Sequence, residues 1–205
     1  MTTEQQTRNT SPVDRIKRGL GRRNIVLVGM MGAGKSSVGK RLAAALDMPF
    51  VDADQEIEAA ANMTIPEIFE TYGEQHFRDG EKKVIARLLR DGPKVVATGG
   101  GAIMDPETRT RIARRGVSVW LKADIQILMD RVKRRSNRPL LSDKDPESVL
   151  RRLLKERQPF YSSADITITS RNTPHQTIIE EIIERLDRSL AGDAEPERDS
   201  VEQSQ

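Results

Sequence analysis

Cysteine, histidine, aromatic residues and long apolar runs are scarce or absent in this chain. Without cysteine it has neither a disulfide framework nor a thiol nucleophile, which fits a reducing compartment. Its two histidines, His76 and His175, lack metal-ligand spacing and are expected on the surface. Aromatic residues make up 3% of the chain, which argues against stacking of single-stranded bases. Because no apolar segment approaches the length of a transmembrane helix or a signal-peptide core, we expect a cytoplasmic protein without membrane contact.

Both ends of the chain are polar. Residues 1–23 are basic and residues 191–205 are acidic, and neither segment has the composition to bury a core. We therefore expect both to be disordered extensions of one folded domain at residues 24–190. The net charge is +3 although the C-terminal segment is acidic, so the positive excess lies elsewhere and suits anionic partners.

Short apolar runs alternate with helical patterns inside the folded part. The runs predict strands at residues 24–28, 49–51, 95–98, 117–121 and 165–169. Helical spacing predicts helices at residues 36–46, 65–72, 81–89, 124–135, 147–156 and around 178–186. This alternation predicts an α/β fold with a parallel sheet covered on both faces, in which ligands bind beyond the carboxyl ends of the strands.

A glycine-rich stretch follows the first predicted strand. Residues 29–36, GMMGAGKS, fit the phosphate-loop pattern GxxxxGK[ST] and open a predicted helix, which is the context that the pattern requires. We expect the loop to bind a nucleoside triphosphate, with Lys35 at the β- and γ-phosphates and the Ser36 hydroxyl on Mg²⁺. The residues predicted to bind ATP here are Gly29, Met30, Met31, Gly32, Ala33, Gly34, Lys35, Ser36 and Ser37.

Polar and glycine residues also follow the next two predicted strands. Asp52 could lie near Mg²⁺, directly or through water, and Asp54 could accept hydrogen bonds from a substrate hydroxyl and help to remove its proton. An alternative role for Asp54 is the N-cap of a helix at residues 55–61. The strand at 95–98 ends on GGG at residues 99–101, which predicts a tight turn or close backbone contact with a ligand. No acidic residue ends that strand, which weakens a GTPase or motor interpretation.

Four arginines are candidates for binding anions: Arg78, Arg138, Arg157 and Arg171. A kinase needs cations for the transferred phosphoryl group, and arginine can also form a fork onto a carboxylate. A solvated helix face is the alternative for any one of them. Five basic residues lie within residues 131–138, so contact with nucleic acid is a second alternative. The polar residues 136–146 predict an exposed loop that carries Arg138 and can close over ATP.

Taken together, these motifs resemble the shikimate kinase family. The matching stretches are the phosphate loop at 29–36, DAD at 52–54, GEQHFR at 73–78, GGG at 99–101, RPLL at 138–141 and RQPFY at 157–161. The resemblance implies ATP-dependent phosphorylation of the 3-hydroxyl of shikimate, in aromatic amino acid biosynthesis. It also implies a three-layer P-loop fold like that of nucleoside monophosphate kinases, with a five-stranded parallel sheet in the order 2-3-1-4-5 and a mobile lid at about residues 131–146.

The same resemblance implies roles for individual residues. Asp54 would bind the shikimate hydroxyls and act as the base, Arg78 and Arg157 would hold the carboxylate, and the Gly100 backbone would contact the substrate. On the nucleotide side, Arg138 would lie over the phosphates, and Arg171 with Pro174 would border the adenine. Ser36 and Asp52 would serve one Mg²⁺ ion, and Lys35 would act with Asp54 and Arg138 in catalysis. We expect a monomer whose partners are shikimate and ATP, with no nucleic acid.

Two alternatives remain open from the sequence. One is a kinase for gluconate or another small metabolite on the same fold, and the other is a nucleic-acid-binding or regulatory NTPase that uses residues 131–138. The nucleic-acid module would not need the grouping of Asp54, Arg78 and Arg157, and its binding would weaken steeply with salt. Arg131 and Arg134 are left without a role.

Overall fold

The computed structural model describes residues 11–133, 145–170 and 173–192. In this part of the chain, five parallel strands form one sheet in the order β2-β3-β1-β4-β5, which confirms the expected order. The strands are β1 (Asn24–Val28), β2 (Phe50–Asp52), β3 (Val95–Ala97), β4 (Gly116–Ala123) and β5 (Ile166–Ser170). Each lies within two residues of its predicted bounds. The register places Val26 of β1 beside Val96 of β3 and Ser118 of β4.

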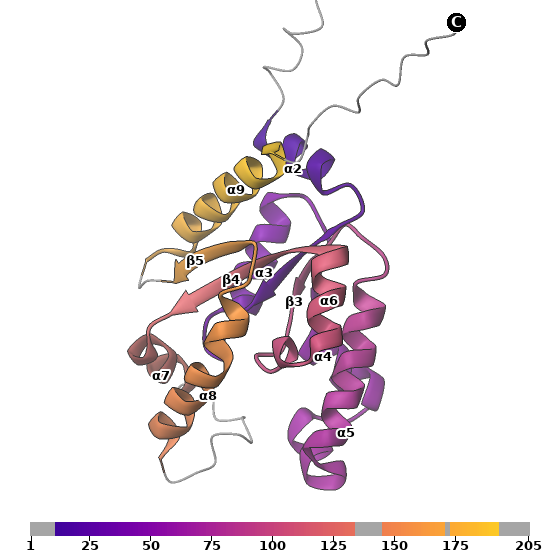
Figure 1. The fold of residues 1–205 in the computed structure, drawn as a ribbon, viewed down its shortest axis with the longest axis vertical. Coiled ribbons are helices and arrows are strands. Elements are labelled where there is room, and N and C mark those ends of the chain that lie inside the picture. Colours follow the sequence, from indigo (N-terminus) through magenta and orange to yellow (C-terminus); the bar gives the residue numbers. More distant parts are fainter. Residues whose placement is uncertain (1–10, 134–144, 171–172, 193–205) are drawn as a thin grey trace, which may run out of the picture.

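Helices cover both faces of the sheet. Their bounds are α2 (Pro12–Leu20), α3 (Lys35–Ala45), α4 (Ala53–Ala61), α5 (Ile65–Leu88), η2 (Ala102–Met104), α6 (Pro106–Arg115), α7 (Ile125–Lys133), α8 (Pro146–Tyr161) and α9 (His175–Gly192). Figure 1 shows α3 and α9 on one side of the sheet and α5, α6 and α8 on the other. No helix in the described ranges is both long and apolar enough to cross a membrane.

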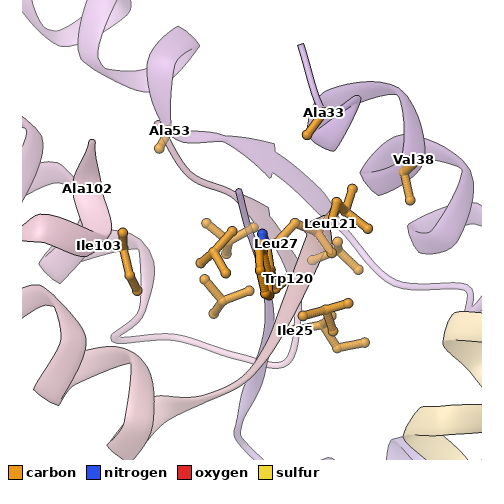
Figure 2. Packing of buried hydrophobic residues seen from close by; sticks show 14 of the residues in the cluster. Ile25, Leu27, Ala33, Val38, Ala53, Ala102, Ile103, Trp120 and Leu121 are labelled. Carbon is orange, nitrogen blue, oxygen red and sulfur yellow. The ribbon is translucent and has the colours of Figure 1, made fainter. Parts of the chain in front are cut away.

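The core lies where β1 and β4 are buried between the two helical layers. All five residues of β1 are buried, because a central parallel strand is covered on both faces and therefore reads as a continuous apolar run. Figure 2 shows Leu27, Trp120 and Leu121 between Ile103 on one side and Val38 of α3 on the other. Trp120 is 5% exposed, as expected of a core residue.

Two helical predictions need correction. The helices predicted at 65–72 and 81–89 are parts of one helix, α5, which kinks at Gly73 with φ 81° and ψ 172°. The second part therefore begins directly after Gly73, earlier than predicted, and Arg78 in its first turns forms ion pairs with Glu74 and Glu81, at i−4 and i+3. Helix α6 was not predicted, since its sequence PETRTRIARR carries a single large apolar residue, Ile112.

The N-terminal segment contains a folded helix, so the prediction of disorder at residues 1–23 is wrong for residues 12–20. In α2, Ser11 caps the first turn and Ile16 and Leu20 are fully buried. The helix packs against α9, where Arg15 forms an ion pair with Asp187. The prediction of disorder was based on the polar composition of residues 1–23, and it overlooked the helical spacing of Val13, Ile16 and Leu20, which form the apolar stripe of this helix. Residues 1–10 and 193–205 lie outside the described part of the chain.

Candidate active site

The phosphate loop joins β1 to α3 through glycines in a left-handed backbone conformation. Gly29, Gly32 and Gly34 have φ angles of 138°, 81° and 95°, which residues with a side chain rarely adopt. A Cβ on Gly29 would also lie 2.7 Å from the carbonyl oxygen of Leu121. Gly34 is the N-cap of α3 and supplies no side-chain hydrogen bond, so the amide groups of the first turn have no side-chain cap. This is the geometry of an anion site at a helix N-terminus.

Lys35 and Ser36 begin α3 at the carboxyl edge of the sheet. Lys35 is 9% exposed, and its ammonium donates hydrogen bonds to the carbonyl oxygens of Gly29 and Met30, at 2.7 and 3.0 Å. The Ser36 hydroxyl donates to Asp52 Oδ2 at 2.5 Å. The loop, the first turn of α3 and the end of β2 are therefore held together by side chains that the sequence assigned to ATP and Mg²⁺.

Asp52 and Asp54 have different structural positions. Asp52 is the N-cap of α4, where its Oδ1 accepts a hydrogen bond from the Asp54 amide at 3.0 Å. Asp54 lies inside α4, so the alternative that Asp54 caps this helix is wrong. Both carboxylates line a cavity of about 300 Å³ together with Lys35, Ser36 and Gly100. The structure thus brings the phosphate loop and the predicted base into one cavity.

The glycine stretch at 99–101 gives space to charged side chains. A Cβ on Gly99 would overlap Glu81 Oε1 and lie 2.9 Å from Asp54 Oδ1, and one on Gly101 would lie 2.5 Å from Arg78 Nη1. Unlike the phosphate-loop glycines, these three do not have positive φ angles. At Gly99 and Gly101, carboxylates and a guanidinium pack directly on the backbone, so a side chain at either position would have to displace them.

A second cavity, of about 530 Å³, lies beside Gly101. Its lining includes Arg78, Glu81 and Arg157, so the predicted substrate-binding residues are divided between two cavities along one glycine stretch. Asp54 and Gly100 line the cavity of the phosphate loop, and the two arginines line the other. Arg78 and Arg157 therefore lie at a different end of the site from Asp54, the predicted base.

Glu81 is a site residue that the sequence analysis missed. Its side chain is 4% exposed, and its Oε2 lies 2.7 Å from Arg78 Nη1 in an ion pair. Burial raises the pKa of Glu81 and Asp54 raises it further, whereas Arg78 and Arg157 lower it. The other oxygen, Oε1, is buried and accepts no hydrogen bond from the described residues. The spacing of Glu81 three residues after Arg78 on one helix predicts that the two side chains can pair, but it carries no signal that the pair is buried.

Arg157 and Tyr161 lie on one face of α8, one turn apart. Arg157 is 6% exposed, and among the described residues its Nη1 has no hydrogen-bond partner. The Tyr161 hydroxyl donates to the carbonyl oxygen of Gly100 at 2.5 Å. A buried polar group without a hydrogen-bond partner lowers the free energy of unfolding by about 1–3 kcal/mol. An unpartnered nitrogen of this kind is therefore a candidate to bind a ligand oxygen.

Arg131 and His175 were left without a site role by the sequence, but both line the cavity of the phosphate loop. Arg131 Nη1 donates to Ser170 Oγ at 3.2 Å and lies 3.4 Å from the Gly32 and Ala33 carbonyl oxygens. His175 is exposed, as expected. Its pKa is lowered by partial loss of water around the ring and by the positive charges of Arg41 and Arg131.

The structure leaves part of the predicted nucleotide site untested. Arg138 and Arg171 lie outside the described residues, as do Arg134 and most of the expected lid. Pro174 is exposed directly before α9. Only one end of the region predicted to border the adenine can therefore be located.

Comparison with known proteins gives consistent matches. The family model described as shikimate kinase matches residues 31–187. A shikimate kinase of Bradyrhizobium diazoefficiens is 62% identical over 191 residues, 92% of each chain. One of Novosphingobium aromaticivorans is 53% identical over 186 residues, 89% of this chain and 96% of the other.

Solved structures agree with these matches. The shikimate kinase from Acinetobacter baumannii in complex with shikimate superposes with a TM-score of 0.80 at 40% identity, covering 88% of this chain and 99% of the other. The shikimate kinase from Aquifex aeolicus gives a TM-score of 0.70 at 34% identity, covering 83% and 98%. A gluconokinase from Sinorhizobium meliloti, at 21% identity, covers 83% and 95% with a TM-score of 0.57, and this shows a shared fold alone.

Proposed function

The chain belongs to the shikimate kinase family, and we infer that it transfers the γ-phosphoryl group of ATP to the 3-hydroxyl of shikimate, releasing ADP and shikimate 3-phosphate. Shikimate is a small ring with a carboxylate and three hydroxyls, so its site needs cations at one end and a base at the other. The observation that carries the inference is the arrangement of Asp54 and Lys35 in one cavity, with Arg78 and Arg157 in the cavity beside it.

On the donor side, we propose that residues 29–37 hold the phosphates. The first-turn amides of α3 and the Lys35 ammonium supply positive potential where charge develops during phosphoryl transfer. When ATP binds, the Lys35 ammonium would exchange its two carbonyl acceptors in the loop for phosphate oxygens. Positioning and electrostatic stabilisation of this kind supply most of the catalysis in phosphoryl transfer.

One Mg²⁺ ion is proposed to accompany ATP. Ser36 Oγ and Asp52 Oδ2 are hard oxygen donors 2.5 Å apart at the mouth of the loop, and they fit this ion. Mg²⁺ commonly takes one or two protein oxygens, phosphate oxygens and water, so a larger cluster of acidic ligands is not needed. When bound, the ion neutralises charge on the phosphates, and Ser36 and Asp52 would orient it.

On the acceptor side, we propose that Asp54 accepts hydrogen bonds from the substrate hydroxyls and takes the proton of the attacking one. Arg78 and Arg157 would bind the carboxylate. Arg157 is well suited, because a ligand oxygen would satisfy its buried, unpartnered Nη1. The Gly100 backbone would complete the site between these groups.

The remaining assignments are proposals that rest on the family resemblance. Arg138 is proposed to act from a lid at about residues 131–146, and Arg171 and Pro174 to border the adenine. The combination of Asp54, Arg78 and Arg157 favours a small hydroxylated carboxylate over nucleic acid as the partner, and membership of the shikimate kinase family favours shikimate over gluconate. A monomer in the cytoplasm remains a prediction.

A coupled assay of ADP release tests the proposed function. The purified chain is mixed with MgATP and then with shikimate or gluconate. We expect turnover with shikimate and none above background with gluconate. Absence of shikimate-dependent ADP release would contradict the proposed function, and turnover with gluconate alone would support the first alternative.

A further inference from the structure

Tyr161, the last residue of α8, is anchored on two sides in the interior. It is 1% exposed, and its ring stacks on Trp120 with centroids 5.8 Å apart and an interplanar angle of 22°. Its hydroxyl donates to the Gly100 carbonyl oxygen at 2.5 Å. The stacking fixes the ring, so the direction of the hydroxyl is set before any ligand binds.

Gly100 lies where the donor and acceptor parts of the site meet. A Cβ placed on it would be 3.3 Å from the Met31 amide nitrogen and 3.4 Å from the Gly29 carbonyl oxygen, both in the phosphate loop. The same point is 3.5 Å from Arg157 Nη1. A side chain at this position would therefore contact both the phosphate loop and the Arg157 guanidinium.

Three consecutive glycines do not hold their own conformation. Glycine has the widest range of backbone angles of any residue, so the stretch depends on hydrogen bonds from outside. Gly99 and Gly101 have backbone partners, since their carbonyl oxygens accept from the Ala102 and Met104 amides, at 3.2 and 2.9 Å. For the Gly100 carbonyl, the described partner is the Tyr161 hydroxyl.

The hydroxyl also sets the direction of a neighbouring amide. The peptide between Gly100 and Gly101 is planar, so fixing its carbonyl oxygen fixes its N–H, which points the opposite way. Burial raises the pKa of Tyr161 to about 12, although Arg157 opposes this, so the hydroxyl keeps its proton at neutral pH. The hydrogen-bond donor is therefore constant over the pH range in which a kinase works.

We propose that Tyr161 is a positioning residue for the acceptor: its hydroxyl holds the middle glycine, so that the glycine backbone and Arg157 meet the substrate in one fixed geometry. This inference rests on the proposed function. Arg157 and Tyr161 are four residues apart on α8, so the helix that presents the guanidinium also anchors the backbone beside it.

Tyr161→Phe tests the proposal, because it removes the hydroxyl and keeps the stacked ring. A neutral hydrogen bond contributes about 1 kcal/mol, so we expect the KM and the calorimetric Kd for shikimate to rise about fivefold. The KM for ATP should stay within about twofold, because the phosphate loop holds the donor. Tyr72→Phe is the matched control: it removes the hydroxyl of a tyrosine that is 55% exposed, and should leave the Kd for shikimate within about twofold.

The outcomes separate the inference from the proposed function. If the wild-type chain shows no shikimate-dependent ADP release, the proposed function fails. If the wild type is active and Y161F binds shikimate as the wild type does, the inference fails. Equal losses for ATP and shikimate, or the same loss in Y72F, would show that the effect is not specific to this hydroxyl and would also overturn the inference.

A second measurement covers the case in which Y161F does not fold. In a Tyr72→Phe background Tyr161 is the sole tyrosine, so global incorporation of 3-fluorotyrosine places one fluorine beside this hydroxyl and on no other tyrosine. The fluorinated hydroxyl is more acidic and a stronger donor, so the Kd for shikimate should change while the KM for ATP does not. An unchanged Kd in this protein would contradict the proposal.

Discussion

Arg78 and Glu81 form an ion pair in which the carboxylate is almost fully enclosed and the guanidinium reaches the substrate cavity. Their Nη1 and Oε2 atoms lie 2.7 Å apart, and the glycine at position 101 leaves room for the guanidinium. Because Glu81 pairs with Arg78, the orientation of a cation proposed to bind the substrate depends on a residue proposed to make no contact with the phosphates. Each part of this arrangement can be tested.

Removing the buried acid should affect stability and substrate binding together. Breaking a buried pair by deleting one partner typically costs about 3–5 kcal/mol, because the other charge is left uncompensated. We expect Glu81→Ala to lower the free energy of unfolding in urea by an amount of this order and to raise the KM for shikimate. Glu81→Gln, which keeps the shape and one acceptor, should lose less of both. Equal effects of the two variants would contradict a contribution from the shape and the remaining acceptor, and would assign the whole loss to the charge.

The raised pKa of Glu81 predicts a pH dependence of stability. The folded chain holds this proton more tightly than the unfolded chain, where the pKa is near 4.5. The associated stabilisation is therefore complete below pH 4.5 and is lost as the pH rises through the higher folded pKa. In urea titrations, the wild type should lose stability relative to E81Q across this window. A gain over the same window would show a lowered pKa instead.

Asp54→Asn should lower turnover without removing a helix cap. General-base catalysis commonly contributes about 10²–10⁴ to the rate, so kcat should fall at least about 100-fold. Saturating ATP should not restore it. The melting temperature should change little, because Asp52 caps α4. Turnover close to the wild type would remove Asp54 from the proposed mechanism.

Arg157→Ala should act on shikimate and spare ATP. Hydrogen bonds to charged groups contribute about 1.5–3 kcal/mol, so we expect the KM for shikimate to rise about 10- to 150-fold. Steady-state kinetics with each substrate varied in turn measures the difference. Arg151→Ala is the control on the same helix, since Arg151 is exposed and paired with Glu147. A loss of ATP affinity with normal shikimate kinetics would contradict the assignment.

Gly99→Ala should damage the site because its methyl group would overlap Glu81 and crowd Asp54. We expect both the melting temperature and kcat/KM for shikimate to fall. Gly80→Ala, on α5, provides a control, because its methyl group would have no neighbouring atom from elsewhere in the fold within 4 Å. Alanine is favoured over glycine inside a helix by up to about 1 kcal/mol, so that variant should be at least as stable as the wild type. Similar behaviour of the two variants would argue against the steric explanation.

The sequence predicted the strands and the loops that follow them, because apolar runs and glycine patterns are local. Lys35, Ser36, Asp52 and Asp54 were located in this way, since each lies within a few residues of a strand end. The strand order came from the family resemblance, because order depends on crossovers that no local pattern records.

Residues whose importance depends on enclosure were not predicted. Glu81 and Arg131 look like ordinary charges on helices, and only the fold shows that one is buried among arginines and the other lies against the phosphate loop. The packing of charged side chains on the glycines at 99–101 was not predicted either. A side chain packed against backbone leaves no trace in spacing, whereas a phosphate loop has a recurring pattern.

The packing of α2 on α9 has a consequence for where this domain begins. The family model starts at residue 31, but Ile16 and Leu20 are buried, and a Cβ on Gly19 would lie 2.8 Å from the Cβ of Leu190. A chain trimmed at residue 31 would lose both α2 and the central strand β1, and the face of α9 that packs on α2 would be exposed to water. The folded unit of this protein therefore starts at or before α2, upstream of the segment that the family model matches.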